Sequence, residues 1–202
     1  MRIGIFGGSF DPVHEGHIRL AEEAASELCL DRIYFVPLFQ NPLENKEKLL
    51  PDAARVRLLR AAVKHHPGFF ISLCEIQRKG SSFTVDTLKY FKKKFGKKDM
   101  LYFLCGADVL PRLEHWKSID EIFKLCRFVV MTRPGYRFIK TKRPVLCLPF
   151  SALDVSSSEL RKRVKRRQAI RGLVSPKIES MMKKYFKQNN GGLKSNRIKK
   201  LI

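Results

Sequence analysis

The sequence lacks the closely spaced cysteine pairs of disulfide-rich and zinc-binding domains. Its five cysteines stand at positions 29, 74, 105, 126 and 147, and no C-x-x-C pair is present. The odd number and the wide spacing argue against a disulfide framework or a zinc knuckle. Several of the cysteines lie within apolar runs, as small buried thiols do. This cysteine usage predicts a protein of the reducing cytoplasm.

Long apolar runs and two common nucleotide-binding fingerprints are also absent. No stretch is apolar over the length needed to span a bilayer, and the first residues do not form the apolar core of a secretory signal. We therefore expect a cytoplasmic protein without a membrane partner. Neither G-x-G-x-x-G nor G-x-x-x-x-G-K-[ST] occurs, which excludes a dinucleotide fingerprint and a Walker loop.

Acidic side chains are scarce. The chain has 19 Asp and Glu against 41 Lys and Arg, which gives a formal net charge of +22. Residues 154–202 alone hold 15 Lys and Arg and 3 Asp and Glu. This excess favours a polyanionic partner such as a nucleotide, a nucleic acid or an acidic surface, and a solvated basic face is an equal alternative.

Length and composition suit one folded domain with an appendage, because the chain has 202 residues and a hydrophobic content of 44%. From Lys187 onward, paired Asn and Gly residues mix with scattered Lys and Arg. The apolar residues there are too few to dock firmly. We therefore predict a domain over residues 1–186 and a basic, disordered tail over residues 187–202.

Short apolar runs alternate with segments of helical periodicity along the domain. The sequence predicts strands at residues 2–6, 33–36, 69–73, 100–105, 128–132 and 145–148. It predicts helices at residues 17–29, 52–65, 84–95, 156–167 and 176–185, with Asp52 as the cap of the second. This alternation is typical of an α/β fold, a doubly wound, mostly parallel Rossmann-like sheet with helices on both faces. Ligands of such sheets bind beyond the carboxyl ends of the strands.

The turn directly after the first strand, G-G-S-F-D-P-V-H-E-G-H at residues 7–17, has the properties of an anion site. Gly7 and Gly8 let backbone N–H groups approach a ligand, and a helix that begins near Gly16 offers free N–H groups and a positive dipole end. His14 and His17, three apart, can both face that point and donate to phosphate oxygens.

No serine or cysteine nucleophile with an oriented base is evident. The turn therefore favours stabilisation of a transferring phosphoryl group by position and electrostatics. Two alternatives remain at this stage: a metal site, for which no third ligand is visible nearby, and a purely structural turn.

The H-x-G-H pattern resembles the signature of the nucleotidyltransferase superfamily, and the longer run from Gly7 to His17 resembles the nicotinate mononucleotide adenylyltransferase family. Further segments resemble that family in the same order. They are S-F-T-V-D-T-L at residues 82–88, F-L-C-G-A-D-V-L at 103–110 with Trp116, R-P-G at 133–135, V-S-S-S-E-L-R at 155–161 and L-V-S-P at 173–176. The matches span residues 3 to about 185.

The resemblance implies transfer of AMP from ATP to nicotinate mononucleotide in NAD biosynthesis, with release of pyrophosphate. It implies Mg²⁺ bound through the ATP phosphates, without a dedicated protein site. His14 and His17 match the catalytic histidines. The implied ATP-binding residues are Gly7, Gly8, Ser9, Phe10, Gly106, Asp108, Ser156, Ser157 and Arg161. The implied mononucleotide-binding residues are Thr84, Trp116 and Arg133.

One loop departs from the family pattern. The family carries P-P-H-K or P-P-H-R after the second strand, whereas this chain has N-P-L-E-N-K-E-K at residues 41–48. Leu43 and Glu44 stand where a histidine and a basic residue are expected. Our hypothesis is that Lys46 takes the place of the missing cation in mononucleotide binding, with Lys48 as second candidate. The competing interpretation is that this contact is lost and the enzyme is slow or inactive.

Two other functions remain open on the sequence. One is phosphopantetheine adenylyl transfer, by a family that shares the histidine turn but lacks the Trp116 and R-P-G features. The other is nucleic-acid binding by a catalytically decayed scaffold, which the basic residues 154–202 favour. For an active enzyme, the same basic region still predicts a weak affinity for nucleic acid. The sequence leaves open the oligomeric state and the preference for nicotinate over nicotinamide.

Overall fold

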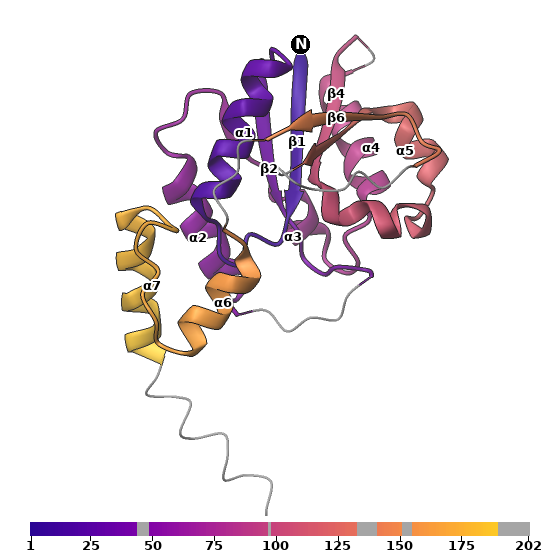
Figure 1. Ribbon diagram of the computed structural model, residues 1–202. Coiled ribbons are helices and arrows are strands. Elements are labelled where there is room, and N and C mark those ends of the chain that lie inside the picture. Colours follow the sequence, from indigo (N-terminus) through magenta and orange to yellow (C-terminus); the bar gives the residue numbers. More distant parts are fainter. Residues whose placement is uncertain (44–48, 97, 133–140, 151–154, 190–202) are drawn as a thin grey trace, which may run out of the picture.

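The computed structural model describes residues 1–43, 49–96, 98–132, 141–150 and 155–189. Within these residues six strands form one sheet in the order β3-β2-β1-β4-β5-β6, and every neighbouring pair is parallel (Figure 1). The strands are β1 (Arg2–Gly8), β2 (Arg32–Pro37), β3 (Phe69–Ile71), β4 (Met100–Gly106), β5 (Arg127–Thr132) and β6 (Val145–Pro149). The predicted α/β class with a doubly wound parallel sheet is confirmed.

Helices cover both faces of this sheet. The helices are α1 (Glu15–Glu27), α2 (Asp52–Val63), α3 (Cys74–Arg78), α4 (Thr84–Phe95), α5 (Ile119–Leu125), α6 (Ser157–Lys165) and α7 (Pro176–Asn189), with a 3₁₀ segment η1 (Ala107–His115). Figure 1 shows α1 and α2 on one side of the strands and α4 and α5 on the other. Each side has its own apolar cluster, since alternate residues of the buried strands face opposite helical layers.

Three short elements were not predicted from the sequence: α3, η1 and α5. None offers enough residues for a helical period to stand out, and η1 contains Pro111. The prediction that Asp52 caps α2 is wrong. Pro51 occupies the N-cap, and Asp52 is the first helical residue, whose carboxylate accepts from Arg55 at 2.6 Å. Strand β1 also extends beyond residue 6, because Gly7 and Gly8 pair with Val36 and Pro37 of β2.

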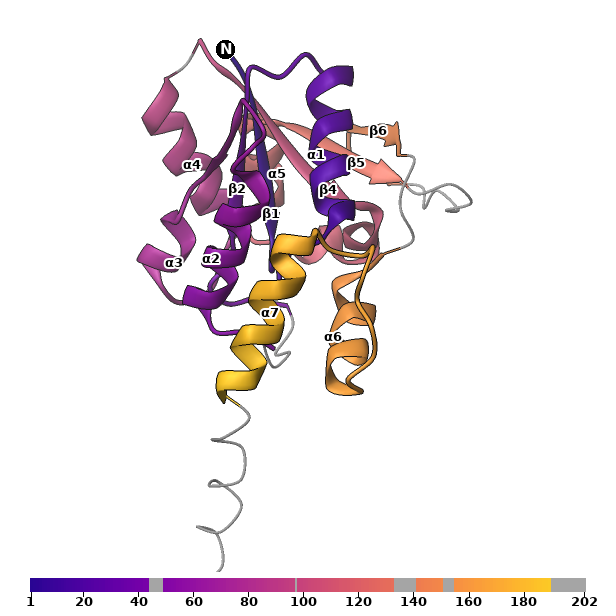
Figure 2. The same cartoon turned by 90° about the vertical axis from the view of Figure 1, so that its left-hand side faces the viewer.

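The strand order reverses beside β1, which has β2 on one side and β4 on the other. Such a switch point opens a crevice at the carboxyl ends of the strands. In Figure 1, β1 runs downward from the labelled N-terminus, so these carboxyl ends face α6 and α7. Figure 2 shows α6 and α7 side by side below the same edge. The turn after β1 therefore begins where ligands of this fold bind.

The division into a domain over residues 1–186 and a tail over residues 187–202 stays a prediction, and helix α7 runs past that boundary. Helix α7 runs to Asn189 and packs through Ile178 and Met182 into the α1–α2 side of the core. Residues 190–202 lie outside the described residues, so the disordered tail stays a prediction. None of the described helices combines the length and the apolar character needed to cross a membrane.

Candidate active site

The two motif histidines stand at the start of α1. His14 is the N-cap residue, and its backbone N–H donates to Nδ1 of His17 at 3.2 Å. The two rings lie against each other, with centroids 3.7 Å apart and planes inclined by 31°. Because Nδ1 of His17 accepts a hydrogen bond, the proton of the neutral ring sits on Nε2. His17 therefore presents an N–H donor on its far nitrogen, next to the positive end of the helix dipole.

Gly16 leaves the space into which His14 folds. A Cβ on Gly16 would lie 3.1 Å from Nδ1 and 3.2 Å from Cε1 of the His14 ring. These distances are tighter than ordinary van der Waals contact, so a side chain there would push the ring away. The glycine of H-x-G-H thus lets the ring of the first histidine pack closely against the start of α1.

Phe10 supports the histidines from within the core. Its side chain is completely buried, and its ring meets the His17 ring edge-on at 5.1 Å. Its backbone has φ 44°, a left-handed conformation that is uncommon for a bulky residue. Of the predicted ATP-binding residues, Phe10 therefore contributes its ring to packing, and only its backbone remains for a ligand.

Helix α6 begins directly against this turn. Ser156 is its N-cap, and its side chain accepts from the backbone N–H of Glu159 at 3.1 Å. The hydroxyl of Ser157 donates to the carbonyl of Pro12 at 3.2 Å, and Nη1 of Arg161 donates to the carbonyl of Asp11 at 3.1 Å. Two helix N-termini, two histidines and one arginine thus meet at one end of the sheet. That concentration of donors and positive charge suits a polyphosphate.

Two of the predicted ATP-binding residues, Gly106 and Asp108, lie where β4 ends, on the other side of the switch point. Gly106 ends the strand, and the exposed Asp108 lies in the first turn of η1. A Cβ on Gly106 would come within 2.6 Å of a carboxylate oxygen of Asp108, so only glycine allows this placement of the carboxylate. Burial raises the pKa of the neighbouring Cys105 thiol well above its usual value, so the thiol stays protonated and is a poor nucleophile.

The two described residues predicted for the mononucleotide, Thr84 and Trp116, lie near one another, at a place we call the corner, because their sequence neighbours Phe83 and Lys117 are in contact. Trp116 follows η1 and is half-buried, with its ring edge-on to Phe103 at 5.9 Å. Thr84 begins α4. Lys117 joins the two positions, since its ammonium lies 4.4 Å from the centroid of the Phe83 ring. The corner therefore combines an aromatic ring with the N-terminus of a long helix.

Two predicted residues lie outside the described residues: Arg133 and Lys46. Their roles stay predictions.

Asp11 and Arg55 bind backbone groups of the candidate site. Neither was among the site residues predicted from the sequence. The buried carboxylate of Asp11 accepts from the backbone N–H groups of Leu49 and Leu50, at 2.7 and 3.0 Å. Arg55 is fully buried on α2 and donates to the carbonyl of Ser9. A signal for Arg55 was present, because it shares the apolar face of the helix with Leu58 and Leu59.

Comparison with known proteins agrees with this geometry. A family model described as cytidylyltransferase-like matches residues 5–163. The chain is 36% identical over 196 residues to a probable nicotinate-nucleotide adenylyltransferase of Thermoanaerobacter sp. (strain X514), over 92% of this chain and 93% of the relative. It is 35% identical over 188 residues to the nicotinate-nucleotide adenylyltransferase of Bacillus subtilis (strain 168), over 93% of this chain and 96% of the relative.

Among solved structures, the Plasmodium falciparum nicotinic acid mononucleotide adenylyltransferase complexed with NaAD shares the fold. Its TM-score is 0.78 at 20% identity, over 92% of this chain and 96% of that chain.

A parallel sheet that carries H-x-G-H at the helix start of its switch point is the arrangement of a nucleotidyltransferase. The relatives named above all belong to one group within that class. The chain belongs to the cytidylyltransferase-like family and, within it, to the nicotinate-nucleotide adenylyltransferases. The resemblance drawn from the sequence motifs is confirmed.

Proposed function

We propose that this protein transfers AMP from ATP to nicotinate mononucleotide, giving nicotinate adenine dinucleotide and pyrophosphate in NAD biosynthesis. The observation that carries the proposal is the meeting of α1 and α6 at the turn after β1, where Arg161 and Ser157 bind the carbonyls of Asp11 and Pro12. Groups that can bind phosphate therefore lie at the starts of both α1 and α6, on either side of the turn after β1. The family membership supports adenylyl transfer as the reaction made there.

In the proposed reaction the mononucleotide phosphate attacks the α-phosphorus of ATP in line. One P–O bond forms to the attacking oxygen, and the bond to the bridging oxygen of pyrophosphate breaks. Nε2 of His17 donates to the phosphate oxygens as negative charge builds on them. His14 lies beside His17, while Arg161 and the N-terminus of α6 bind the triphosphate. The protein acts by alignment and charge stabilisation, and no covalent intermediate on the chain is needed.

Mg²⁺ bound through the ATP phosphates fits the residues of the site. Among the described residues, no group of three or more His, Cys, Asp or Glu side chains could hold a metal ion. Magnesium typically keeps several waters and takes substrate phosphates as ligands, so it needs no protein cage. Bound in this way, it would neutralise phosphate charge and stabilise the leaving pyrophosphate.

Geometry at the corner of Thr84 and Trp116 favours the acid over the amide. The first N–H groups of α4 have no partner within the helix, and they lie at the positive end of its dipole. A nicotinate carboxylate can accept from them while its ring packs on Trp116. Charged hydrogen bonds exceed neutral ones by roughly 1–1.5 kcal/mol, so we expect about tenfold higher kcat/KM for nicotinate mononucleotide than for the amide.

Pyrophosphate release from ATP, measured with nicotinate mononucleotide, nicotinamide mononucleotide and phosphopantetheine in parallel, tests the proposal. The acid should be the best substrate. A clear preference for phosphopantetheine would assign the chain a different reaction, and a preference for the amide would refute the role of the α4 N-terminus. If a protein that melts cooperatively turns over none of the three substrates, the alternative of a catalytically inactive nucleic-acid-binding protein would be favoured.

Lys46 is proposed as a further cation for the mononucleotide phosphate, in place of the family's basic residue. A lysine ammonium binds phosphate as a point charge and does not need the planar, two-pronged geometry of an arginine guanidinium. We expect Lys46→Ala to raise the KM for the mononucleotide about tenfold, the cost of one charged hydrogen bond. Lys48→Ala is the matched control and should change it little. Equal, wild-type kinetics of both variants would dismiss the replacement.

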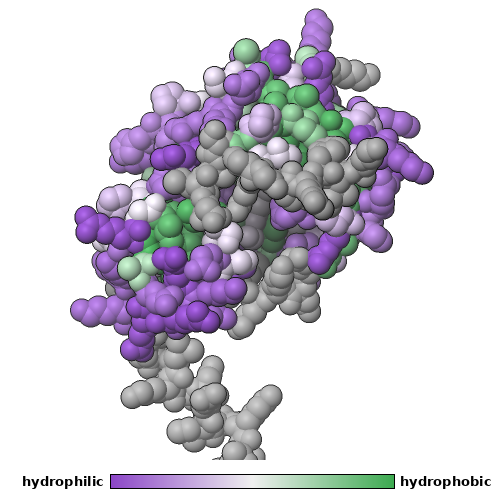
Figure 3. Space-filling model, in the orientation of Figure 1, coloured by the Kyte–Doolittle hydropathy of each residue, from purple (hydrophilic) through white to green (hydrophobic). Residues whose placement is uncertain are grey.

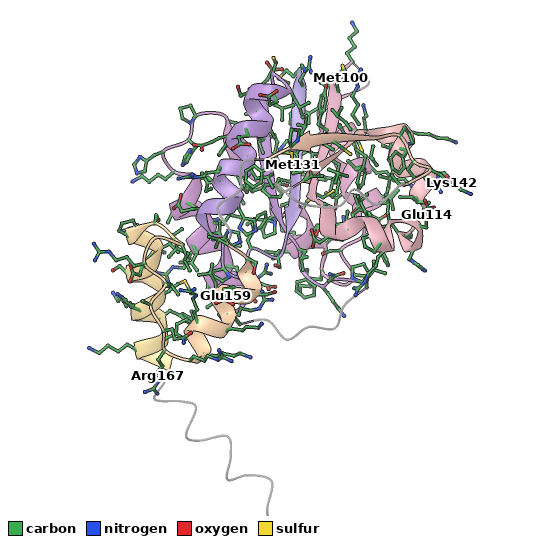
Figure 4. The ribbon with its side chains drawn as sticks, viewed as in Figure 1. Met100, Glu114, Met131, Lys142, Glu159 and Arg167 are labelled. Carbon is green, nitrogen blue, oxygen red and sulfur yellow. The ribbon has the colours of Figure 1, made fainter. Side chains whose placement is uncertain are left out.

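Weak nucleic-acid binding is a second proposed property, and the charge of the C-terminal helices supports it. Residues 155–187 hold eleven Lys and Arg and two Glu, and both Glu side chains are in ion pairs, with Arg163 and Lys183. Hydrophilic atoms gather over this region in Figure 3. In Figure 4, Glu159 lies near the sheet and Arg167 far from it, so basic residues continue away from the site.

Truncation after Asn189 tests the contribution of the C-terminal residues to this binding. It removes four cations, Lys194, Arg197, Lys199 and Lys200. We expect kcat and the melting temperature to be unchanged. The slope of log affinity for a single-stranded oligonucleotide against log salt should fall by about 3, at ~0.7 for each lost cation. A matched control replaces the same four residues by Ser. Loss of turnover on truncation, or an unchanged slope, would contradict the prediction.

A further inference from the structure

Arg55 carries a fully buried positive charge that belongs to none of the substrate-binding motifs. It lies on α2, and its side chain has no solvent exposure. Burying a guanidinium is costly unless its donors find acceptors. The acceptors of Arg55 therefore indicate which parts of the structure this residue holds in place.

Arg55 has three acceptors: backbone carbonyls in two different segments of the site and the carboxylate of Asp52 on its own helix. Nη1 donates to the carbonyl of Ser9, in the turn after β1. Nη2 donates to the carbonyl of Leu38, just after β2, at 2.7 Å, and to the carboxylate of Asp52 at 2.6 Å. The Nε atom has no acceptor within the described part of the chain. One planar side chain thus links the turn after β1 to the segment that follows β2.

The contact with Ser9 sets the direction of the next peptide group. In a trans peptide the carbonyl and the following N–H point to opposite sides, so the carbonyl of Ser9 and the amide of Phe10 are opposed. Arg55 draws the carbonyl toward α2 and thereby turns the amide of Phe10 away from it. A bulky residue keeps a left-handed φ, here 44°, only where its surroundings hold it.

The contact with Leu38 leads to the other half of the site. The amide of Leu38 donates to the carbonyl of Gly8 at 3.0 Å. The next residue, Phe39, donates from its amide to the hydroxyl of Ser82 at 2.9 Å, and Ser82 lies just before Thr84. A continuous path therefore runs from Arg55 to the start of α4, on the mononucleotide side. None of the hydrogen bonds found for Arg55 reaches α6 or the end of β4.

We propose that Arg55 is a positioning residue of adenylyl transfer. It aligns the turn at Ser9 and Phe10 with the mononucleotide segment that ends at Thr84, and it touches neither substrate. This inference rests on the proposed function. It assigns the two substrates different sensitivities, because the path from Arg55 runs on to the start of α4, whereas among the groups predicted for ATP it touches only the carbonyl of Ser9 and neither Arg161 nor the start of α6.

The test compares Arg55→Lys with the wild-type enzyme. Lysine keeps the charge but lacks the planar fork, so it cannot hold both carbonyls in the same geometry. Since a misplacement of about 1 Å can cost ~10²-fold in rate, we expect kcat to fall by about 10- to 100-fold. The KM for nicotinate mononucleotide should rise more than the KM for ATP, because Arg55 shares only the turn at Ser9 with the predicted ATP site and does not contact Arg161 or the start of α6. Titration of the fluorescence of Trp116, the single tryptophan, reports mononucleotide binding directly.

Two further variants separate positioning from folding. Arg60→Lys makes the same change at an exposed position of the same helix and should match the wild type. Ser82→Ala interrupts the path at a half-buried position and leaves Arg55 untouched, and it also removes the hydrogen bond between Ser82 and the buried Glu75. It should also raise the KM for the mononucleotide and spare the KM for ATP. Because Ser82→Ala leaves Arg55 in place, it keeps the inference testable if Arg55→Lys does not fold.

The outcomes distinguish the inference from the function on which it rests. A wild-type enzyme that releases no pyrophosphate would overturn the proposed function and the inference with it. Wild-type turnover with unaltered kinetics of Arg55→Lys or Ser82→Ala would overturn the inference alone. So would a lower kcat with both KM values unchanged, since a smaller folded fraction gives that pattern.

Discussion

Replacement of His17 by alanine is expected to lower kcat by about 10²–10³-fold, the usual cost of removing one donor aimed at developing charge. The structure gives the physical basis. Nδ1 of His17 accepts from the His14 amide, which leaves Nε2–H as the donor, and the ring lies against the tilted ring of His14 and in edge-on contact with Phe10. The donor is preorganised, so its loss should appear in kcat more than in KM.

Single-turnover and steady-state pyrophosphate release would measure this effect. His65→Ala is a suitable control, because His65 is exposed beyond the C-terminal end of α2. A cooperative melting transition of His17→Ala near the wild-type temperature would show that the fold is intact. If His17→Ala turns over at the wild-type rate, the proposed mechanism is wrong.

Replacement of Arg161 by methionine is expected to reduce kcat/KM for ATP by about 10- to 100-fold. Hydrogen bonds to charged groups contribute roughly 1.5–3 kcal/mol, and the triphosphate would lose such bonds. Arg161 also donates to the carbonyl of Asp11 and to the hydroxyl of Ser158, at 3.1 and 2.9 Å. These contacts hold its guanidinium at the motif turn, so the charge is already in place when ATP arrives.

The matched control for this change is Lys165→Met, which removes one exposed cation from the last turn of the same helix. Arg161→Lys should lie between the wild type and Arg161→Met, because it keeps the charge without the fork. Equal kinetics of Arg161→Met and Lys165→Met would show that the triphosphate does not use Arg161. The mononucleotide KM should change little in all three variants.

The turn at the centre of the candidate site could be recognised because its residues are close together in the sequence. From Gly7 to His17 the chain passes through a strand end, a turn and a helix start, and each has a local chemical signature. Ser175 and Pro176 predicted the start of α7 in the same way. The Ser175 hydroxyl accepts a hydrogen bond from the backbone N–H of Ile178. Short elements gave no such signal, and α3 and α5 went unpredicted for that reason.

The sequence by itself determined the parallel α/β fold and the glycine and histidine turn that we propose binds phosphate. Hydrophobic periods of two and 3.6 residues, glycines and helix caps act within a few positions, so they can be recognised without knowing the fold. Only the tertiary structure decided which distant residues join the turn. Arg55 reaches Ser9 from the inner face of another helix, and the Ser157 side chain, which the sequence assigned to ATP only through the family resemblance, reaches Pro12 across 145 positions. Such contacts depend on how the strands cross over and which helix faces become buried, and no local pattern encodes that.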